Sequence, residues 1–148
     1  MFQLLFSFLL LSFSHAEPIK INLITTNDIH GVIGKQKANF MNPQYPPTIL
    51  GGAAFSKYVD KLKIEIKKNN EGILILDGGN FFQGSPLGLA DNGQTMIEWM
   101  NRIDYDGLVP GNYDFISGAK NLNELSKMST FPFLYSNLNC NNCPLTNA

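Results

Sequence analysis

The sequence has little net charge, little cysteine and little histidine. Its formal net charge of -1 gives no electrostatic basis for binding nucleic acid or an acidic membrane face. Lysines gather between Lys57 and Lys68, but apolar residues recur between them at helical spacing, which is typical of the exposed face of an amphipathic helix. With 148 residues, 44% of them hydrophobic and 16% charged, the chain is about one domain long and can bury a core.

The only cysteines are Cys140 and Cys143, in the polar segment "NLNCNNCPLTNA". A Cys-x-x-Cys pair can mark a redox centre or half of a zinc site. No second pair accompanies it. The favoured interpretation is therefore a disulfide between these two cysteines, or a disulfide from each of them to another cysteine further along the chain. No Asn-x-Ser/Thr sequence occurs, and N-glycosylation is therefore not expected.

Long apolar runs are also scarce, and the one at the N-terminus indicates export. "FQLLFSFLLLSF" is too short to span a bilayer comfortably, and Ser14-His15-Ala16 places small residues where a signal peptidase reads them. We therefore expect residues 1–16 to be a signal peptide and the mature chain to begin at Glu17. No second such stretch follows, so no membrane anchor is expected in these 148 residues.

Strand-like and helix-like segments alternate along the rest of the sequence. Apolar and β-branched runs predict strands, and amphipathic runs predict helices. The predicted strands are 19–26, 72–77, 106–112 and 131–138, and the predicted helices are 53–68, 93–103 and 118–128. Segments 38–52 and 78–88 carry the prolines and glycines of loops. The alternation predicts an α/β fold with a mainly parallel sheet built from βαβ units.

Three of the predicted strands end in polar side chains and glycines. These ends read Asn27-Asp28-Ile29-His30-Gly31, Asp77-Gly78-Gly79-Asn80 and Gly111-Asn112-Tyr113-Asp114. In parallel α/β sheets ligands bind at the carboxyl ends of the strands, so we expect the three segments to meet at one edge. Each alone is also typical of a solvated turn, because Asn, Asp and Gly are turn residues. The acid and histidine two positions apart favour instead one edge of a metal site.

Other residues of these segments are expected to serve the backbone or the core. The glycines are expected at turns, where their conformational freedom is needed. Phe81 and Phe82 are expected to pack in the core rather than to stack on a ligand. The glycines concerned are Gly31, Gly79, Gly84 and Gly111.

These segments resemble those of the metallophosphoesterase (calcineurin-like) superfamily, and most closely its secreted 5'-nucleotidase branch. That family has an Asn-Asp-x-His-Gly segment after the first strand, Gly-Asp-x-x-x-Gly after the second and Gly-Asn-His-Glu-Phe-Asp after the third. The resemblance extends to "GGAAFSKYVDKLK", "LDGGNFFQGSP" and "FPFLYSNL", in the same order and spacing. It implies that residues 17–148 are the N-terminal half of a four-layer α-β-β-α domain.

The resemblance implies phosphate ester hydrolysis by two divalent cations, which activate a water and hold the phosphoryl oxygens. It makes Asp28 and His30 ligands of the first cation, and Asn112 a ligand of the second cation through its side-chain carbonyl. Asn80 occupies the position of the aspartate that bridges both cations. Tyr113 occupies that of a histidine that donates to the phosphate, and Asp114 that of the acid beside it. Zinc, manganese, magnesium and cobalt are the candidate ions.

Several departures from the family pattern weaken this expectation. Asn80 is neutral and a poor bridge between cations, so we expect at most one bound cation. Tyr113 can donate a phenolic hydrogen bond, and Ile116 replaces the aspartate that would orient the family histidine. The family's later histidine ligands and its C-terminal nucleoside-binding domain are absent from these 148 residues, where His15 and His30 are the only histidines.

Two hypotheses about function remain open. The first is a secreted metal-dependent phosphoric ester hydrolase of the 5'-nucleotidase type, acting on a nucleotide or another small phosphate ester. In that case this chain is its N-terminal part, with a degraded dimetal site, and is inactive alone. The second is a secreted, non-catalytic protein that retains the fold for binding. A Cys-x-x-Cys redox module is a third, weaker alternative. The sequence does not indicate an oligomeric state.

Overall fold

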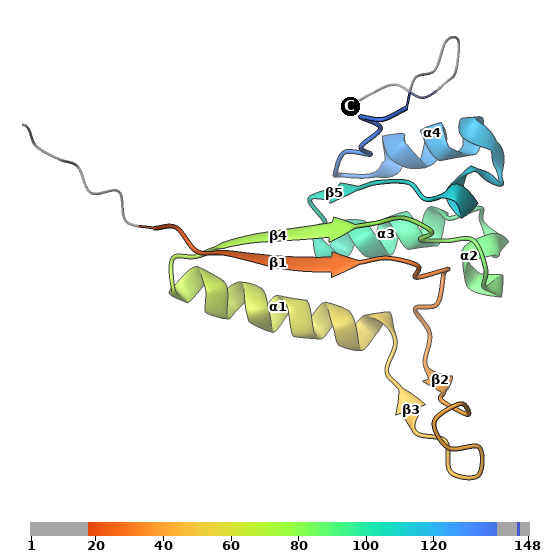
Figure 1. The fold of residues 1–148 in the computed structure, drawn as a ribbon, viewed down its shortest axis with the longest axis horizontal. Helices are drawn as coiled ribbons and strands as arrows, with labels where there is room; N and C mark the ends of the chain where they lie inside the picture. The colour runs from red at the N-terminus through yellow and green to blue at the C-terminus, as the bar shows by residue number, and fades with distance from the viewer. Residues whose placement is uncertain (1–17, 139–144, 146–148) are drawn as a thin grey trace, which may run out of the picture.

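Three parallel strands form the centre of the structure, a computed structural model that describes residues 18–138 and Leu145. β1 (Ile21–Thr26) pairs with β4 (Gly72–Asp77) along its whole length, and β4 pairs with β5 (Gly107–Leu108). The order across the sheet is β1-β4-β5 (Figure 1). Parallel strands need crossover connections, and helices provide them here. The predicted α/β fold with a parallel sheet and βαβ units is confirmed.

Three helices pack on one face of this sheet. They are α1 (Gly52–Lys68), α3 (Gln94–Ile103) and α4 (Gly118–Met128). Their apolar sides meet the inward-facing residues of β4 in a single core. The core includes Val59, Ile75, Phe81, Phe82, Met96, Ile97, Met100, Leu108, Leu122 and Leu125. The predicted core positions of Phe81 and Phe82 are confirmed, since neither side chain is exposed.

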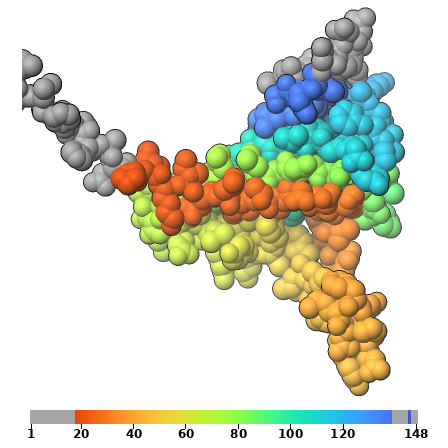
Figure 2. Space-filling view, in the orientation of Figure 1, coloured from red at the N-terminus to blue at the C-terminus, as the bar shows by residue number. Residues whose placement is uncertain are grey.

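The opposite face of the sheet is apolar and uncovered. Successive residues of a strand point to opposite faces, so Leu23 and its partner in register, Leu74, share the outer face. Leu23 is 61% exposed and Leu74 is 41% exposed. β1 lies uncovered along its length in the space-filling view (Figure 2). The described residues thus form one helix layer and one sheet layer, two of the four layers that the resemblance implies.

Most predicted elements agree with the structure to within two residues. The exceptions concern the third and fourth predicted strands. β5 is shorter than the predicted strand 106–112, because Pro110 and Gly111 turn the chain into a 3-10 helix, η1 (Asn112–Phe115).

The predicted fourth strand, 131–138, is wrong in extent. Only Phe133 pairs, in a single parallel bridge with Leu108. The N–H of Leu134 donates to the Leu108 carbonyl at 2.7 Å, and the N–H of Leu138 then closes a turn on the Tyr135 carbonyl at 2.8 Å. The alternating burial that suggested a strand is real, with Phe131, Phe133 and Tyr135 all buried, but β5 is too short to pair with the whole segment.

The predicted loops contain short elements that periodicity does not reveal. β2 (Gln36–Lys37) and β3 (Thr48–Ile49) form an antiparallel hairpin that extends away from the sheet (Figure 1). α2 (Pro86–Ala90) begins within the predicted loop 78–88 and ends two residues beyond it. Its N-cap is Ser85, whose hydroxyl accepts the N–H of Gly88 at 3.1 Å. A serine followed by proline is a recognised start signal for a helix, so α2 was predictable in principle.

Two predictions lie outside the described residues, namely the signal peptide at 1–16 and the bonding of Cys140 and Cys143. Within the part of the chain that the structure describes, none of the helices combines the length and the apolar character needed to cross a bilayer.

Candidate functional site

The loops after β1 and β4 lie side by side beyond the ends of the strands. The N–H of Asp28 donates to the Gly79 carbonyl at 2.9 Å, and the N–H of His30 donates to the Asn80 carbonyl at 2.9 Å. The N–H of Gly31 donates to the Phe81 carbonyl at 2.8 Å, so the pairing of the two strands continues through their loops. The first and second predicted segments are therefore in direct contact.

The third segment meets the second one through glycines. Gly79 has a φ of +98°, and a Cβ there would lie 2.6 Å from the Val109 carbonyl oxygen and collide with the backbone N of Gly111. A Cβ on Gly111 would collide in turn with the side-chain oxygen of Asn80. This close approach requires glycine at both positions. The expected meeting of all three strand ends at one edge of the sheet is confirmed.

Asp28, His30 and Asn80 share an uncommon backbone conformation. Their φ angles are +52°, +51° and +56°, in the left-handed region that non-glycine residues rarely adopt. They make up half of the six non-glycine residues with positive φ in the described part of the chain. Such conformations concentrate at functional sites, where surrounding structure holds them in place. The backbone thus singles out the same three residues as the sequence motif.

Both oxygens of the Asp28 carboxylate accept a hydrogen bond from an asparagine amide. Oδ1 accepts from Nδ2 of Asn80 at 2.8 Å, and Oδ2 accepts from Nδ2 of Asn27 at 2.8 Å. These two donors, more than the nearby His30 ring, hold the pKa of Asp28 below its ordinary value. Asp28 is therefore an anion, with a side chain 55% exposed to solvent.

The His30 ring is oriented by a backbone carbonyl. Its Nδ1 lies 2.6 Å from the carbonyl oxygen of Gln83, and because a carbonyl only accepts, Nδ1 carries a proton. In the neutral ring the lone pair is then on Nε2, which lies 3.7 Å from Oδ1 of Asp28. The Tyr113 ring meets the His30 ring edge to face, with centroids 5.5 Å apart. The sequence carried no signal for Gln83, because it acts through its backbone.

Asn112 lies at the start of η1, between two residues that contact Asn80. The N–H of Tyr113 donates to Oδ1 of Asn80 at 3.0 Å, and Gly111 approaches the same amide. The Asn112 side chain is exposed and forms no hydrogen bond with the described residues. Its role as a metal ligand stays a prediction, and Ile116, 59% exposed, makes no polar contact that replaces an orienting aspartate.

Two buried carboxyl groups support the site from beneath. Asp77 accepts the hydroxyl of Thr26 at 2.6 Å and the N–H of Gly79 at 2.8 Å, and burial raises its pKa to about 6. Asp114 is completely buried and accepts backbone N–H groups from both neighbouring loops. Burial raises the pKa of Asp114 as well, against the opposing effect of these donors. The hydrogen bonds that these two buried carboxyl groups accept fix the backbone of the loops around the site.

Asp28 and His30 are two side chains that could bind the same divalent cation. No group of three or more His, Cys, Asp or Glu side chains within the described ranges is placed to hold a metal ion. Asp28 and His30 nevertheless offer a carboxylate oxygen and a free ring nitrogen 3.7 Å apart, about the spacing of two ligands on one cation. A second cation sharing residue 80 does not fit, because Asn80 is neutral and turns its N–H groups toward Asp28.

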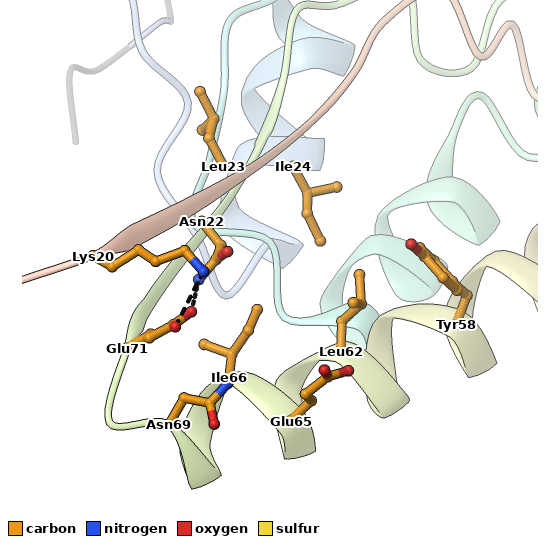
Figure 3. A pocket seen from close by; sticks show the side chains of 10 residues that line it. All are labelled: Lys20, Asn22, Leu23, Ile24, Tyr58, Leu62, Glu65, Ile66, Asn69 and Glu71. Atoms are coloured by element: carbon orange, nitrogen blue, oxygen red, sulfur yellow. Dashed lines mark hydrogen bonds and ion pairs between the residues drawn. The ribbon is translucent and has the colours of Figure 1, made fainter.

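A separate hollow lies at the opposite ends of the same strands. A cavity of about 430 Å³ between β1 and α1 is lined by Lys20, Asn22, Glu65 and Glu71 among others (Figure 3). Lys20 forms an ion pair with Glu71 at 3.1 Å, and the amide of Asn22 donates to the same carboxylate at 2.8 Å. Because it lies beside the amino ends of the strands, this cavity is distinct from the site at their carboxyl ends.

Comparison with known proteins finds sequence relatives that match most of this chain. No family model matches the chain. The silent protein UshA(0) of Salmonella typhimurium is 31% identical over 119 residues, which are 80% of this chain and 20% of that protein. The snake venom 5'-nucleotidase of Gloydius brevicauda is 28% identical over 124 residues, 83% of this chain and 20% of the enzyme. The chain thus spans about a fifth of the length of the curated relatives it matches.

Solved structures agree on the fold. The sulfate thiohydrolase SoxB of Thermus thermophilus superposes with a TM-score of 0.69 at 17% identity, over 82% of this chain and 30% of that chain. A 5'-nucleotidase precursor from Thermus thermophilus gives a TM-score of 0.65 at 23% identity, over 77% of this chain and 21% of that chain. The chain is therefore a homologue of the 5'-nucleotidases by sequence, and its fold is that of the metallophosphoesterases.

Proposed function

We propose that this chain is the first part of the catalytic domain of a secreted phosphoesterase of the 5'-nucleotidase type. Its ligand is a nucleotide or another small phosphate ester. One observation carries the proposal: Asp28, His30 and Asn80 come together at the carboxyl ends of β1 and β4, each in a left-handed conformation. The sequence relatives named 5'-nucleotidases support the substrate class.

In this proposal each residue of the site has a definite task. Asp28 and His30 hold one divalent cation of the zinc, manganese, magnesium or cobalt type, with Asn112 as a further oxygen donor. When bound, the cation polarises a phosphoryl oxygen as a Lewis acid. Gln83 fixes the His30 ring through its carbonyl, so that Nε2 faces Asp28. The exposed phenol of Tyr113 donates to a phosphate oxygen beside His30.

We further propose that other segments of a longer protein complete the domain. Two observations support this. Asp28 and His30 supply fewer ligands than even one divalent cation takes, and the outer face of the sheet exposes Ile21, Leu23 and Leu74. An apolar parallel sheet is normally covered on both faces. Residues 1–16 act as the signal peptide in this scheme.

The test is hydrolysis of AMP and p-nitrophenyl phosphate with added Mn²⁺, Zn²⁺ or Co²⁺. Both this chain and the longest product of its transcript are assayed. We expect metal-dependent turnover by the longer product, lost in Asp28→Ala and His30→Ala and retained in Asp60→Ala, which alters an exposed side chain of α1. Absence of turnover with every metal would contradict the proposal and favour a non-catalytic binding protein.

A further inference from the structure

We propose that the Asn80 side chain takes the place of a second cation. It connects the first and third strand-end loops by hydrogen bonds, so the site is organised without metal and binds no more than one divalent cation. The inference rests on the proposed function in taking Asp28 and His30 as cation ligands, but its test does not depend on catalysis.

The orientation of the Asn80 amide follows from its two partners. The backbone N–H of Tyr113, a donor, lies 3.0 Å from Oδ1, and the Asp28 carboxylate, an acceptor, lies 2.8 Å from Nδ2. Exchanging the amide oxygen and nitrogen would place a donor against a donor and an acceptor against an acceptor. The N–H groups therefore face Asp28, on the side where a shared metal ligand would need an oxygen.

All four polar groups of Asn80 are occupied by neighbouring loops. Besides the two side-chain contacts, its N–H donates to the Asp114 carboxylate at 2.7 Å, and its carbonyl accepts the N–H of His30 at 2.9 Å. Asparagine also tolerates the left-handed conformation, with φ of +56°, better than most residues. Because the backbone is fixed on both sides, the amide is held in place.

Aspartate at this position would behave differently. An oxygen in place of Nδ2 would lie against Oδ1 of Asp28, and two carboxylates at that separation repel unless a cation lies between them. Asparagine removes this requirement, because its N–H groups supply a neutral donor to the same oxygen. The carboxylate-to-amide difference thus changes what joins the loops, from a cation to a hydrogen bond.

The experiment compares the unmodified chain with Asn80→Asp, Asn80→Ala and Asn70→Asp. Asn70 is a matched control, since it also has a left-handed conformation, with φ of +55°, but lies in the turn between α1 and β4. Bound Mn²⁺ and Zn²⁺ are counted by equilibrium dialysis with metal analysis. The melting temperature is measured in EDTA and again in excess Mn²⁺.

We expect at most about one equivalent of metal on the unmodified chain and a melting temperature that EDTA leaves unchanged. Asn80→Asp should bind about one equivalent more, melt roughly 5 °C lower in EDTA and recover in Mn²⁺. Asn80→Ala should melt lower without recovery, and Asn70→Asp should match the unmodified chain. If Asn80→Asp folds only with Mn²⁺, that outcome also supports the proposal.

Two results would overturn the proposal. One is two equivalents of metal on the unmodified chain. The other is an Asn80→Asp variant that has the same stoichiometry and the same melting temperature in EDTA as the unmodified chain. If this chain binds one cation as expected but the longer product hydrolyses no phosphate ester, only the proposed function is contradicted.

Discussion

The buried carboxylate of Asp114 accepts the backbone N–H of Asn80 at 2.7 Å, although the two residues are 34 positions apart in the sequence. The same carboxylate accepts the N–H groups of Gly111 at 2.8 Å and of Phe81 at 3.0 Å. It therefore joins the loop after β4 to the loop after β5. The resemblance makes Asp114 a candidate catalytic residue, but its contacts are those of a residue that positions the loops.

Asp114→Asn should destabilise the protein. The amide oxygen can replace only one of the two carboxylate oxygens, which accept the N–H groups of Asn80 and Phe81. The amide NH₂ then faces the other N–H group, which is left buried without an acceptor. Each such loss costs about 1–3 kcal/mol. Urea denaturation followed by circular dichroism measures the effect. Asp60→Asn, at an exposed position of α1, should change the free energy of unfolding by less than about 0.5 kcal/mol. Equal stability of the two variants would exclude this role for Asp114.

The meeting of the loops is predictable from the sequence, but the tasks of individual residues are less so. Parallel strands bring their carboxyl ends to one edge, and this rule alone places Asp28, His30 and Asn80 together. Whether Asp114 points outward or inward depends on the turn of η1, which no local pattern encodes. Gln83 contributes only a backbone carbonyl, so its side chain carries no information about its role.

The fourth predicted strand shows that local sequence patterns do not determine every element of the fold either. Phe131, Phe133 and Tyr135 alternate as a strand should, and they are buried as expected. Pairing, however, requires a partner, and β5 offers only Gly107 and Leu108. The extent of a strand is therefore set by a distant segment. By contrast, α1 follows from its helical periodicity and β4 from its continuous apolar run, and both were predicted to within one residue.

Stability should decrease with rising pH across the titration of Asp77. Burial raises its pKa to about 6 from an ordinary 3.8, so the folded state binds this proton more tightly than the unfolded state. The stabilisation is complete below about pH 4 and is lost as the pH rises through 6, an effect of roughly 3 kcal/mol. Urea denaturation at intervals between about pH 4 and 8 measures the slope, to which buried Asp114 contributes in the same direction.

Asp77→Asn provides the comparison for this pH dependence. The amide oxygen still accepts the N–H of Gly79, and the amide nitrogen donates to the Thr26 hydroxyl, so the local contacts survive without a titrating proton. The variant should show a flatter profile between about pH 4 and 6 and greater stability than the unmodified chain near neutral pH. An unchanged slope would assign the pH dependence to other groups.

The neutral His30 ring should carry its proton on Nδ1. The Gln83 carbonyl at 2.6 Å accepts only, which selects this tautomer and leaves Nε2 facing Asp28. Long-range ¹H–¹⁵N correlation spectra at about pH 8 distinguish the two nitrogens, and added Zn²⁺ should shift the Nε2 signal more than the Nδ1 signal. His30→Gln identifies the signals by their loss. A ring protonated on Nε2 would contradict both the orientation and the metal-ligand role.

Gly79→Ala should be far more damaging than Gly34→Ala. Residue 79 has a φ of +98°, and a methyl group there would collide with the backbone of Gly111 and lie 2.6 Å from the Val109 carbonyl oxygen. Neither backbone can move without separating the loops after β4 and β5, so we expect a loss of more than about 2 kcal/mol of unfolding free energy. A Cβ on Gly34 would meet no atom within 4 Å, and alanine there should change stability by less than about 1 kcal/mol. Thermal and urea unfolding of both variants measure the difference, and similar stabilities would show that the close approach of the two loops is not needed for folding.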